Sequence, residues 1–190
     1  MSLYFTSDQH FGHVNILKYA ERPFECNREG MTDCARYMYD NYQKTVKTGD
    51  TVVFLGDVAL INDENRPYYM DMLSSMKGRK MLVLGNHDNQ SKGFYYGCGF
   101  LDVRDFYIVD KFFICHYPCT ASGSPAEKKA KSVFFNTKCT EIYHGHIHNK
   151  HPASFDGISR YNMCVDYKPN DFRPVLIQNY ELNDFFEDLH

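Results

Sequence analysis

Five short apolar runs, each ending in a cluster of polar residues, constrain this chain more than any other feature. The runs are residues 3–5, 51–55, 81–84, 112–115 and 141–143. Runs of this length that are rich in Val, Leu, Phe and Tyr are typical of buried β-strands. The loops that follow the carboxyl ends of strands build the sites of open α/β folds. We therefore expect the five polar clusters to meet in space.

Helical periodicity appears between these runs. From Ala35 to Val46, apolar residues recur at the spacing of one helix face. Thr32 is expected to cap this helix, and Asp33 favours its positive N-terminal end. The remaining patterns predict helices at 66–76, 124–133 and 181–189, a β-hairpin that joins 106–109 to 112–115, and strands at 161–165 and 175–178.

The order of these segments indicates the fold class. Strands and helices alternate in the first half, and strands dominate the second half. This order predicts an α/β fold, a two-sheet αββα sandwich whose outer faces are covered by helices. Because no internal repeat or long linker interrupts the pattern, we expect a single domain over residues 1–190.

Composition and charge limit the kinds of partner and the cellular compartment that we expect for this chain. The net charge is −3, so the chain lacks the overall basic surplus that is usual in nucleic-acid binders, although a local basic patch stays open. The seven cysteines contain no CxxC pair, which argues against zinc-ribbon and thioredoxin-like sites. There is no leader-like N-terminus and no apolar stretch of the ~20 residues that a membrane helix needs. We expect a cytoplasmic protein with reduced thiols and no membrane partner.

The polar clusters contain the residue types of a two-metal site. Hydrolysis of a phosphate ester needs a positioned nucleophile and positive charge on the oxygens, and two metal ions supply both. Oxygen ligands and imidazoles suit such ions. If the chain is extended at each position, Asp8 and His10 share one face, and so do His146 and His148. The candidate ligands are Asp8, His10, Asp57, Asn86, His116, His146 and His148.

Each cluster on its own is ordinary, because an Asp-x-His, a Gly-Asp turn or an Asn-His-Asp turn occurs in many proteins without a metal. The ordered set favours a metal site. Asp8-x-His10, Gly56-Asp57, Gly85 to Asp88, His116 and Gly145 to His148 together resemble the calcineurin-like metallophosphoesterase superfamily. The stretch from Ser7 to Ile16, followed by Arg22-Pro23-Phe24, resembles its small, uncapped bacterial and phage phosphoesterases.

The resemblance implies roles for individual residues. Asp8, His10 and His148 would hold the first of two divalent metals, and Asn86, His116 and His146 the second. Asp57 would bridge both metals, and a water activated by them would attack phosphorus. His87 would bind the phosphate or protonate the leaving group, with Asp88 orienting it. Manganese is the first expectation for the metal, and iron, zinc and nickel are the alternatives.

One departure from the superfamily bears on the substrate. Its protein Ser/Thr phosphatases continue the second motif with an Asp-Arg-Gly, whereas Gly56-Asp57 here continues with Val58 and Ala59. This argues against a protein phosphatase and favours a small phosphate ester, with phosphodiesters and nucleotides as the first candidates. The alternatives are a nuclease on the same site, or a binding scaffold without catalysis, like the retromer subunit that resembles this superfamily.

Two further residues are candidate substrate contacts. His13 stands three residues after His10 and either reaches the phosphate or closes the loop. Arg22 either clamps the phosphate or packs as an ordinary surface arginine. The sequence leaves the oligomeric state open.

Overall fold

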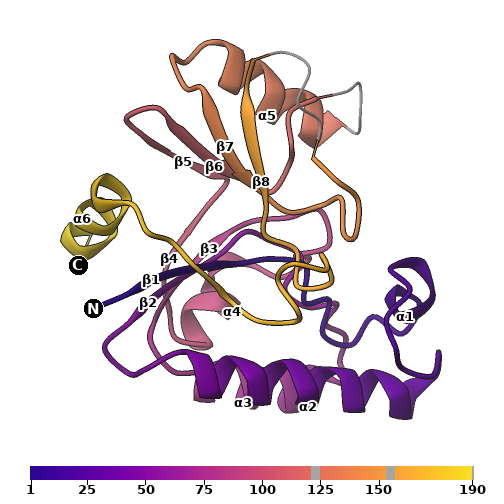
Figure 1. The fold of residues 1–190 in the computed structure, drawn as a ribbon. Helices are drawn as coiled ribbons and strands as arrows, with labels where there is room; N and C mark the ends of the chain where they lie inside the picture. The colour runs from indigo at the N-terminus through magenta and orange to yellow at the C-terminus, as the bar shows by residue number, and fades with distance from the viewer. Residues whose placement is uncertain (121–124, 153–156, 190) are drawn as a thin grey trace.

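Two β-sheets pack face to face, and helices cover their outer faces (Figure 1). The computed structural model describes residues 1–120, 125–152 and 157–189. The first sheet has the strand order β4-β3-β2-β1-β9 and the second β5-β6-β7-β8. This arrangement confirms the αββα sandwich that the sequence predicts.

The first sheet is parallel except for one edge. It consists of β1 (Leu3–Thr6), β2 (Thr51–Phe54), β3 (Arg79–Val83), β4 (Phe100–Arg104) and, antiparallel to β1, β9 (Val175–Leu176). Its outer face is covered by α2 (Arg28–Thr45), α3 (Arg66–Ser75) and α4 (Lys92–Gly97) (Figure 1). A short helix, α1 (Ile16–Tyr19), precedes α2.

The second sheet begins with the expected hairpin. β5 (Phe106–Val109) pairs antiparallel with β6 (Phe112–Cys115), and β7 (Glu141–His144) and β8 (Ser159–Asn162) continue in parallel. Helix α5 (Pro125–Phe135) covers its outer face, and α6 (Tyr180–Asp188) packs beside the space between the sheets (Figure 1). Ser124, where the sequence predicts the start of α5, lies outside the described residues.

Alternating apolar residues hold these layers together. In β2, Val52 and Phe54 pack under the helices of the first sheet, whereas Val53 points into the core between the sheets. In β6, Ile114 faces that same inner core, and Phe113 packs beneath α5. Successive strand residues point to opposite faces, and both faces here are covered. That is why the sequences of β2 and β6 are almost entirely apolar.

The predicted strand at 161–165 is wrong in its bounds, for a reason that matters for the site. β8 ends at Asn162. Beyond it the chain leaves the second sheet, and the amide of Val165 donates to the Ser7 carbonyl at 3.0 Å. Cys164 also forms an isolated parallel bridge with Ser7. This crossing brings the residues after 163 to the end of β1.

The cap predicted for α2 is wrong, the last strand ends at Leu176 and not at residue 178, and two further elements were not predicted. Helix α2 begins at Arg28 with Asn27 as its cap, and the Thr32 hydroxyl bonds to Arg28 O within the first turn. The sequence analysis missed α4, because its two glycines resemble a turn. It also missed β4, an edge strand with exposed and polar positions. Within the described residues, no helix is both long and apolar enough to cross a membrane.

Candidate functional site

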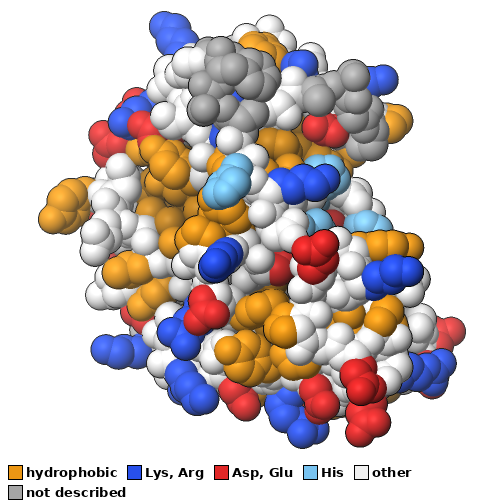
Figure 2. Space-filling view, turned by 45° about the vertical axis from the view of Figure 1, so that its right-hand side comes forward, with side chains coloured by type: hydrophobic (Ala, Val, Ile, Leu, Met, Phe, Trp, Pro, Cys, Tyr) orange, Lys and Arg blue, Asp and Glu red, His pale blue; other side chains and the backbone are white. Residues whose placement is uncertain are grey.

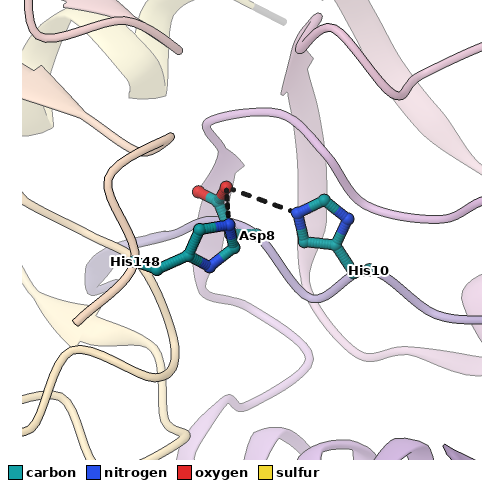
Figure 3. A group of neighbouring side chains, drawn as sticks. All are labelled: Asp8, His10 and His148. Carbon is teal, nitrogen blue, oxygen red and sulfur yellow. Dashed lines mark ion pairs between the residues drawn. The ribbon is translucent and has the colours of Figure 1, made fainter. Parts of the chain in front are cut away.

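Two groups of metal-binding side chains lie at the carboxyl ends of the strands. Within each group, the possible ligand atoms all lie within 4.8 Å of one another. The first group is Asp8, His10 and His148, and the second is Asp57, His116 and His146. Figure 3 shows the imidazoles of His10 and His148 converging on Asp8 from two separate stretches of chain. The strand ends therefore bring together residues up to 140 positions apart in the sequence, from Asp8 to His148.

Asp57 lies between the two groups. Its Oδ2 is 3.5 Å from Nε2 of His10 and 3.3 Å from Nε2 of His116. Its Oδ1 accepts a hydrogen bond of 2.7 Å from the backbone N–H of His87. One carboxylate oxygen is thus within reach of both groups, and the other is held by the backbone.

Asn86 completes the second group. Its Oδ1 lies 3.1 Å from Nε2 of His116, and Nδ1 of His146 lies 3.2 Å from the same nitrogen. The other ring nitrogen of His116, Nδ1, lies 2.8 Å from the carbonyl of Leu55, which can only accept. Nδ1 therefore carries the proton in the neutral ring, and Nε2 faces the group. All seven candidate ligands from the sequence are brought together.

The backbone at these residues is not extended, as the spacing argument assumed. Five of the candidate ligands have a positive φ: Asp8 (60°), His10 (52°), Asp57 (54°), His146 (72°) and His148 (53°). Non-glycine residues adopt this region uncommonly, and such strain gathers at functional sites. Asp8 and His10 thus converge because the chain turns sharply after β1, and not because alternate strand residues share a face.

Two buried ligand atoms lack a hydrogen-bond partner within the described residues, namely Oδ1 of Asp8 and Nε2 of His10. The other oxygen of Asp8 is fully used: it accepts from the Ser7 hydroxyl (2.5 Å), the Cys164 thiol (3.2 Å) and the His146 amide (2.9 Å). An unpaired buried carboxylate oxygen is costly. A cation between these two atoms would satisfy both, so the residues fit a metal.

The ionised carboxylates of the site also favour the binding of a cation. Burial raises the pKa of the Asp8 carboxyl, but the His10 ring, with Nε2 at 3.6 Å from Oδ1, and the charges of the other histidines outweigh it, so the pKa lies well below its usual range. Burial lowers the pKa of His116, yet the Asp57 carboxylate and its hydrogen bond raise that pKa to about 10. Burial also raises the pKa of the Asp57 carboxyl, but the charge of His116 outweighs it and lowers that pKa, so the Asp8 and Asp57 carboxylates are both ionised at neutral pH and attract protons or metal ions.

Arg22 is buried and holds the loop after β1, so it fits neither of the roles that the sequence left open, a phosphate clamp or a surface arginine. Its side chain is buried and forms an ion pair of 2.9 Å with Asp166. It also donates to the carbonyl oxygens of Gln9 (2.8 Å) and Asp8 (2.6 Å). A guanidinium that is buried with these partners is not available to a substrate. Its partner lies 144 residues away in the sequence, so this pairing could not be read from the local pattern.

Asp166 is the functional residue that the sequence analysis missed. Its Oδ2 is 3.0 Å from Nδ1 of His148, whose Nε2 then faces Asp8 at 3.8 Å. Carboxylates that orient metal-binding histidines in this way are a common feature of metal sites. A signal was present, because Asp166 directly follows the apolar run that ends at Val165, as the other polar clusters follow theirs.

Asp88 has a different role from the expected one. Its carboxylate accepts hydrogen bonds from the backbone amides of Asp57 (2.8 Å), Val58 (2.9 Å) and Gly85 (2.8 Å). Among the described residues, no hydrogen bond joins it to the His87 ring. Asp88 therefore positions the Asp57 loop and does not orient His87.

His87 and His13 lie beside the first group. The ring of His87 is 5.1 Å from that of His10 and 5.4 Å from that of His13, measured between centroids. His13 closes the loop: its amide donates to the carbonyl of His10 at 3.0 Å, and its Nδ1 lies 3.3 Å from Nδ1 of His10. Burial, and then the charges of His10 and His87, lower the pKa of His13 to about 4, so it is neutral at pH 7.

Comparison with known proteins gives two sequence relatives and one solved structure of similar fold. The chain is 29% identical over 175 residues to an uncharacterized protein of Methanocaldococcus jannaschii, a match that covers 91% of this chain and 85% of that protein. It is 29% identical over 85 residues to the gene 66 protein of Mycobacterium phage L5, covering 45% of this chain and 39% of that one. A solved structure, a protein of unknown function from Aquifex aeolicus, superposes with a TM-score of 0.69 at 25% identity, over 97% of this chain and 98% of that one.

The family comparison agrees with the geometry. Residues 1–150 match the model of the calcineurin-like phosphoesterases. The matched segment contains every candidate ligand from Asp8 to His148, whereas Asp166 lies beyond it. The chain therefore belongs to the calcineurin-like phosphoesterase family.

Proposed function

We propose that this chain is a single-domain, dinuclear metal-dependent phosphoesterase that cleaves a small phosphodiester or a nucleotide ester. The observation that carries the proposal is the position of Asp57, whose Oδ2 lies within 3.5 Å of one histidine from each group. Two divalent cations, manganese first among the candidates, would supply a water nucleophile at neutral pH and positive charge for the phosphate oxygens. Asp8, His10 and His148 would hold one cation, Asn86, His116 and His146 the other, and Asp57 both.

His87 is the proposed acid. Its neighbour Asn86 faces the second group through Oδ1, and its own backbone N–H holds Asp57. Its ring is partly exposed and has no hydrogen-bond partner within the described residues. Such a ring is free to bind a phosphate oxygen or to protonate the leaving group.

The proposed preference for diesters follows from the lack, among the described residues, of an arginine that could clamp the phosphate. A phosphomonoester carries more negative charge than a diester, and a guanidinium clamp is the usual means of neutralising it. Arg22 is buried against Asp166, and the second motif supplies no arginine. We expect diesters to be cleaved at least as well as monoesters.

The test combines metal binding with a substrate panel. The protein is stripped of metal and titrated with manganese, and then assayed on aryl monoesters, aryl diesters, cyclic nucleotides and oligonucleotides. We expect two ions per chain, one ion or fewer for Asp57→Asn, and turnover that depends on the added metal. Saturation at one ion in the unaltered protein would contradict the dinuclear site. A strong preference for monoesters at every pH would contradict the diester assignment, and a preference for oligonucleotides would identify a nuclease.

A further inference from the structure

An apolar cavity opens beside the second ligand group. Its volume is about 210 Å³, and it is lined by the loop after β3 from Leu84 to Asn86, by Asp105 and Phe106 at the start of β5, by Tyr117 and by residues of helix α5. An apolar cavity of roughly 150 Å³ is enough to hold a benzene ring. Figure 2 shows hydrophobic side chains next to exposed histidines on one face of the molecule. The cavity is therefore large enough for one aromatic ring, next to the ligand groups.

The walls of the cavity suit a flat ring. Phe106 is partly exposed and stacks on Phe113 at 5.4 Å between centroids, so its position is fixed by the core beneath α5. The ring of Tyr117 lies edge-on to the imidazoles of His116 (4.9 Å) and His146 (5.0 Å). Two aromatic rings thus line the cavity, and aromatic rings prefer stacked or edge-to-face partners.

The cavity borders the second ligand group through a shared residue. Asn86 lines it and is exposed, and its Oδ1 is 3.1 Å from Nε2 of His116. At the rim, Lys129 forms an ion pair of 3.2 Å with Asp105. The rim thus carries a donor and an acceptor, and the interior carries apolar surface. A nucleobase has this combination of a flat face and a polar edge.

We propose that this cavity binds an aromatic ester arm of the substrate, so that the enzyme selects phosphodiesters in which one arm carries a flat ring such as a nucleobase. The inference rests on the proposed function for the position of the phosphate, but it concerns residues outside the ligand groups. The walls of the cavity, and not the contacts to the phosphate, would decide which ester the enzyme prefers.

Binding of stable analogues tests the cavity without turnover. Phenylphosphonate and methylphosphonate share the phosphorus group and differ only in the arm. In the manganese-loaded protein, calorimetry should show phenylphosphonate bound about tenfold or more tightly than methylphosphonate, because burial of a ring contributes at least that much. Equal affinities would overturn the proposal.

Two variants locate the selectivity in this cavity. Ala126→Phe fills it from an exposed position of α5, and Phe106→Leu removes one aromatic wall while keeping it apolar. Both should reduce the preference for phenylphosphonate to less than about threefold and leave the affinity for methylphosphonate unchanged. Ser132→Phe, exposed on the same helix but not in the cavity lining, is the matched control. If Ala126→Phe weakened both ligands equally, the cavity would not be the arm site.

Rates measured on two esters show whether this inference or the proposed function fails. Methyl trifluoroethyl phosphate and the trifluoroethyl ester of thymidine 5′-phosphate release the same leaving group, which has no ring, and only the second ester carries an aromatic arm. We expect Ala126→Phe to raise the KM of the thymidine ester about tenfold or more and to leave kcat on the methyl ester unchanged. If the unaltered protein cleaves neither ester but still prefers phenylphosphonate, the proposed function fails and the cavity assignment stands. If it cleaves both and Ala126→Phe behaves as Ser132→Phe does, the cavity assignment alone fails.

Discussion

The backbone amide of Asp57 donates a hydrogen bond of 2.8 Å to the carboxylate of Asp88, thirty-one residues along the chain. The same carboxylate holds the amides of Val58 and Gly85. Close approach of the two loops depends on Gly85, because a Cβ there would lie 2.2 Å from Oδ1 of Asp57. Asp88 thus links the two loops that carry Asp57 and Asn86, and it acts on the site through the backbone.

Asp88→Asn should therefore weaken metal binding without removing a ligand. The amide side chain places an N–H₂ group against backbone donors, so at least one of these bonds is lost and the Asp57 loop shifts. Loss of such an outer contact typically lowers metal affinity ~10–100-fold. Manganese titration of the variant checks this, with Asp63→Asn, an exposed aspartate, as the control. Unchanged manganese affinity in Asp88→Asn would show that the loop does not depend on this carboxylate.

Asp166 has two partners, and substitution should affect both. Asp166→Asn leaves the buried Arg22 without its charge partner, and breaking a buried ion pair typically costs about 3–5 kcal/mol of unfolding free energy. It also weakens the hydrogen bond that orients His148, which should lower the affinity for the first metal ~10–100-fold. Urea denaturation and manganese titration measure the two effects.

A double variant separates the two roles of Asp166. Arg22→Met/Asp166→Leu replaces the pair by apolar groups, so it should regain part of the lost unfolding free energy. It should not regain manganese affinity, because His148 still lacks its partner. Asp171→Asn, at an exposed ion pair, is the surface control and should change neither quantity. Recovery of metal affinity in the double variant would mean that Asp166 acts only through stability.

The candidate ligands could be predicted because each follows a strand, and the carboxyl ends of parallel strands gather at one edge of a sheet. The αββα sandwich was predictable for the same reason, since unbroken apolar runs require cover on both faces. Contacts between distant segments were not predictable. The pairing of Arg22 with Asp166 depends on how the chain crosses from β8 to the end of β1, and no local pattern encodes that crossing. The resemblance implied that Asp88 orients His87, but the turn directs its carboxylate to the backbone amides of neighbouring loops.

Lys80 gives a prediction on stability against pH. Its ammonium is buried and donates to the carbonyl oxygens of Leu73 and Cys98, near the ends of α3 and α4. Burial lowers its pKa from 10.5 to about 8. Between these values the unfolded chain binds more protons than the folded protein, so this group makes stability rise with pH there.

The comparison with Lys80→Met isolates that contribution. The unfolding free energy of the unaltered protein, relative to the variant, should increase by about 1–3 kcal/mol between pH 8 and pH 10.5. Urea denaturation of both proteins at several pH values, in the same chelator-containing buffer, measures it. Lys128→Met, at an exposed lysine of α5, should give a curve parallel to that of the unaltered protein. A parallel curve for Lys80→Met would mean that the buried ammonium titrates normally.

The last prediction concerns the chemical role of His87. His87→Ala and His87→Asn remove the ring but keep the backbone N–H that donates to Asp57 at 2.7 Å. Both variants should therefore retain two metal ions. General acid catalysis typically contributes ~10²–10⁴-fold, so their turnover should fall by that factor on a diester with a poor, alkoxide leaving group. The loss should be much smaller with 4-nitrophenolate, which leaves without a proton.

Asp57→Asn is the contrasting variant, because it removes charge from the carboxylate that lies between both groups. It should lose metal and, with it, turnover on good and poor leaving groups alike. Metal content and rates on the two kinds of ester are measured for all three variants. If His87→Ala lost metal as readily as Asp57→Asn, the ring would be needed for the ligand groups themselves. If its rate on the poor leaving group were unchanged, another residue would supply the proton. Only retained metal together with a loss that depends on the leaving group identifies His87 as the acid.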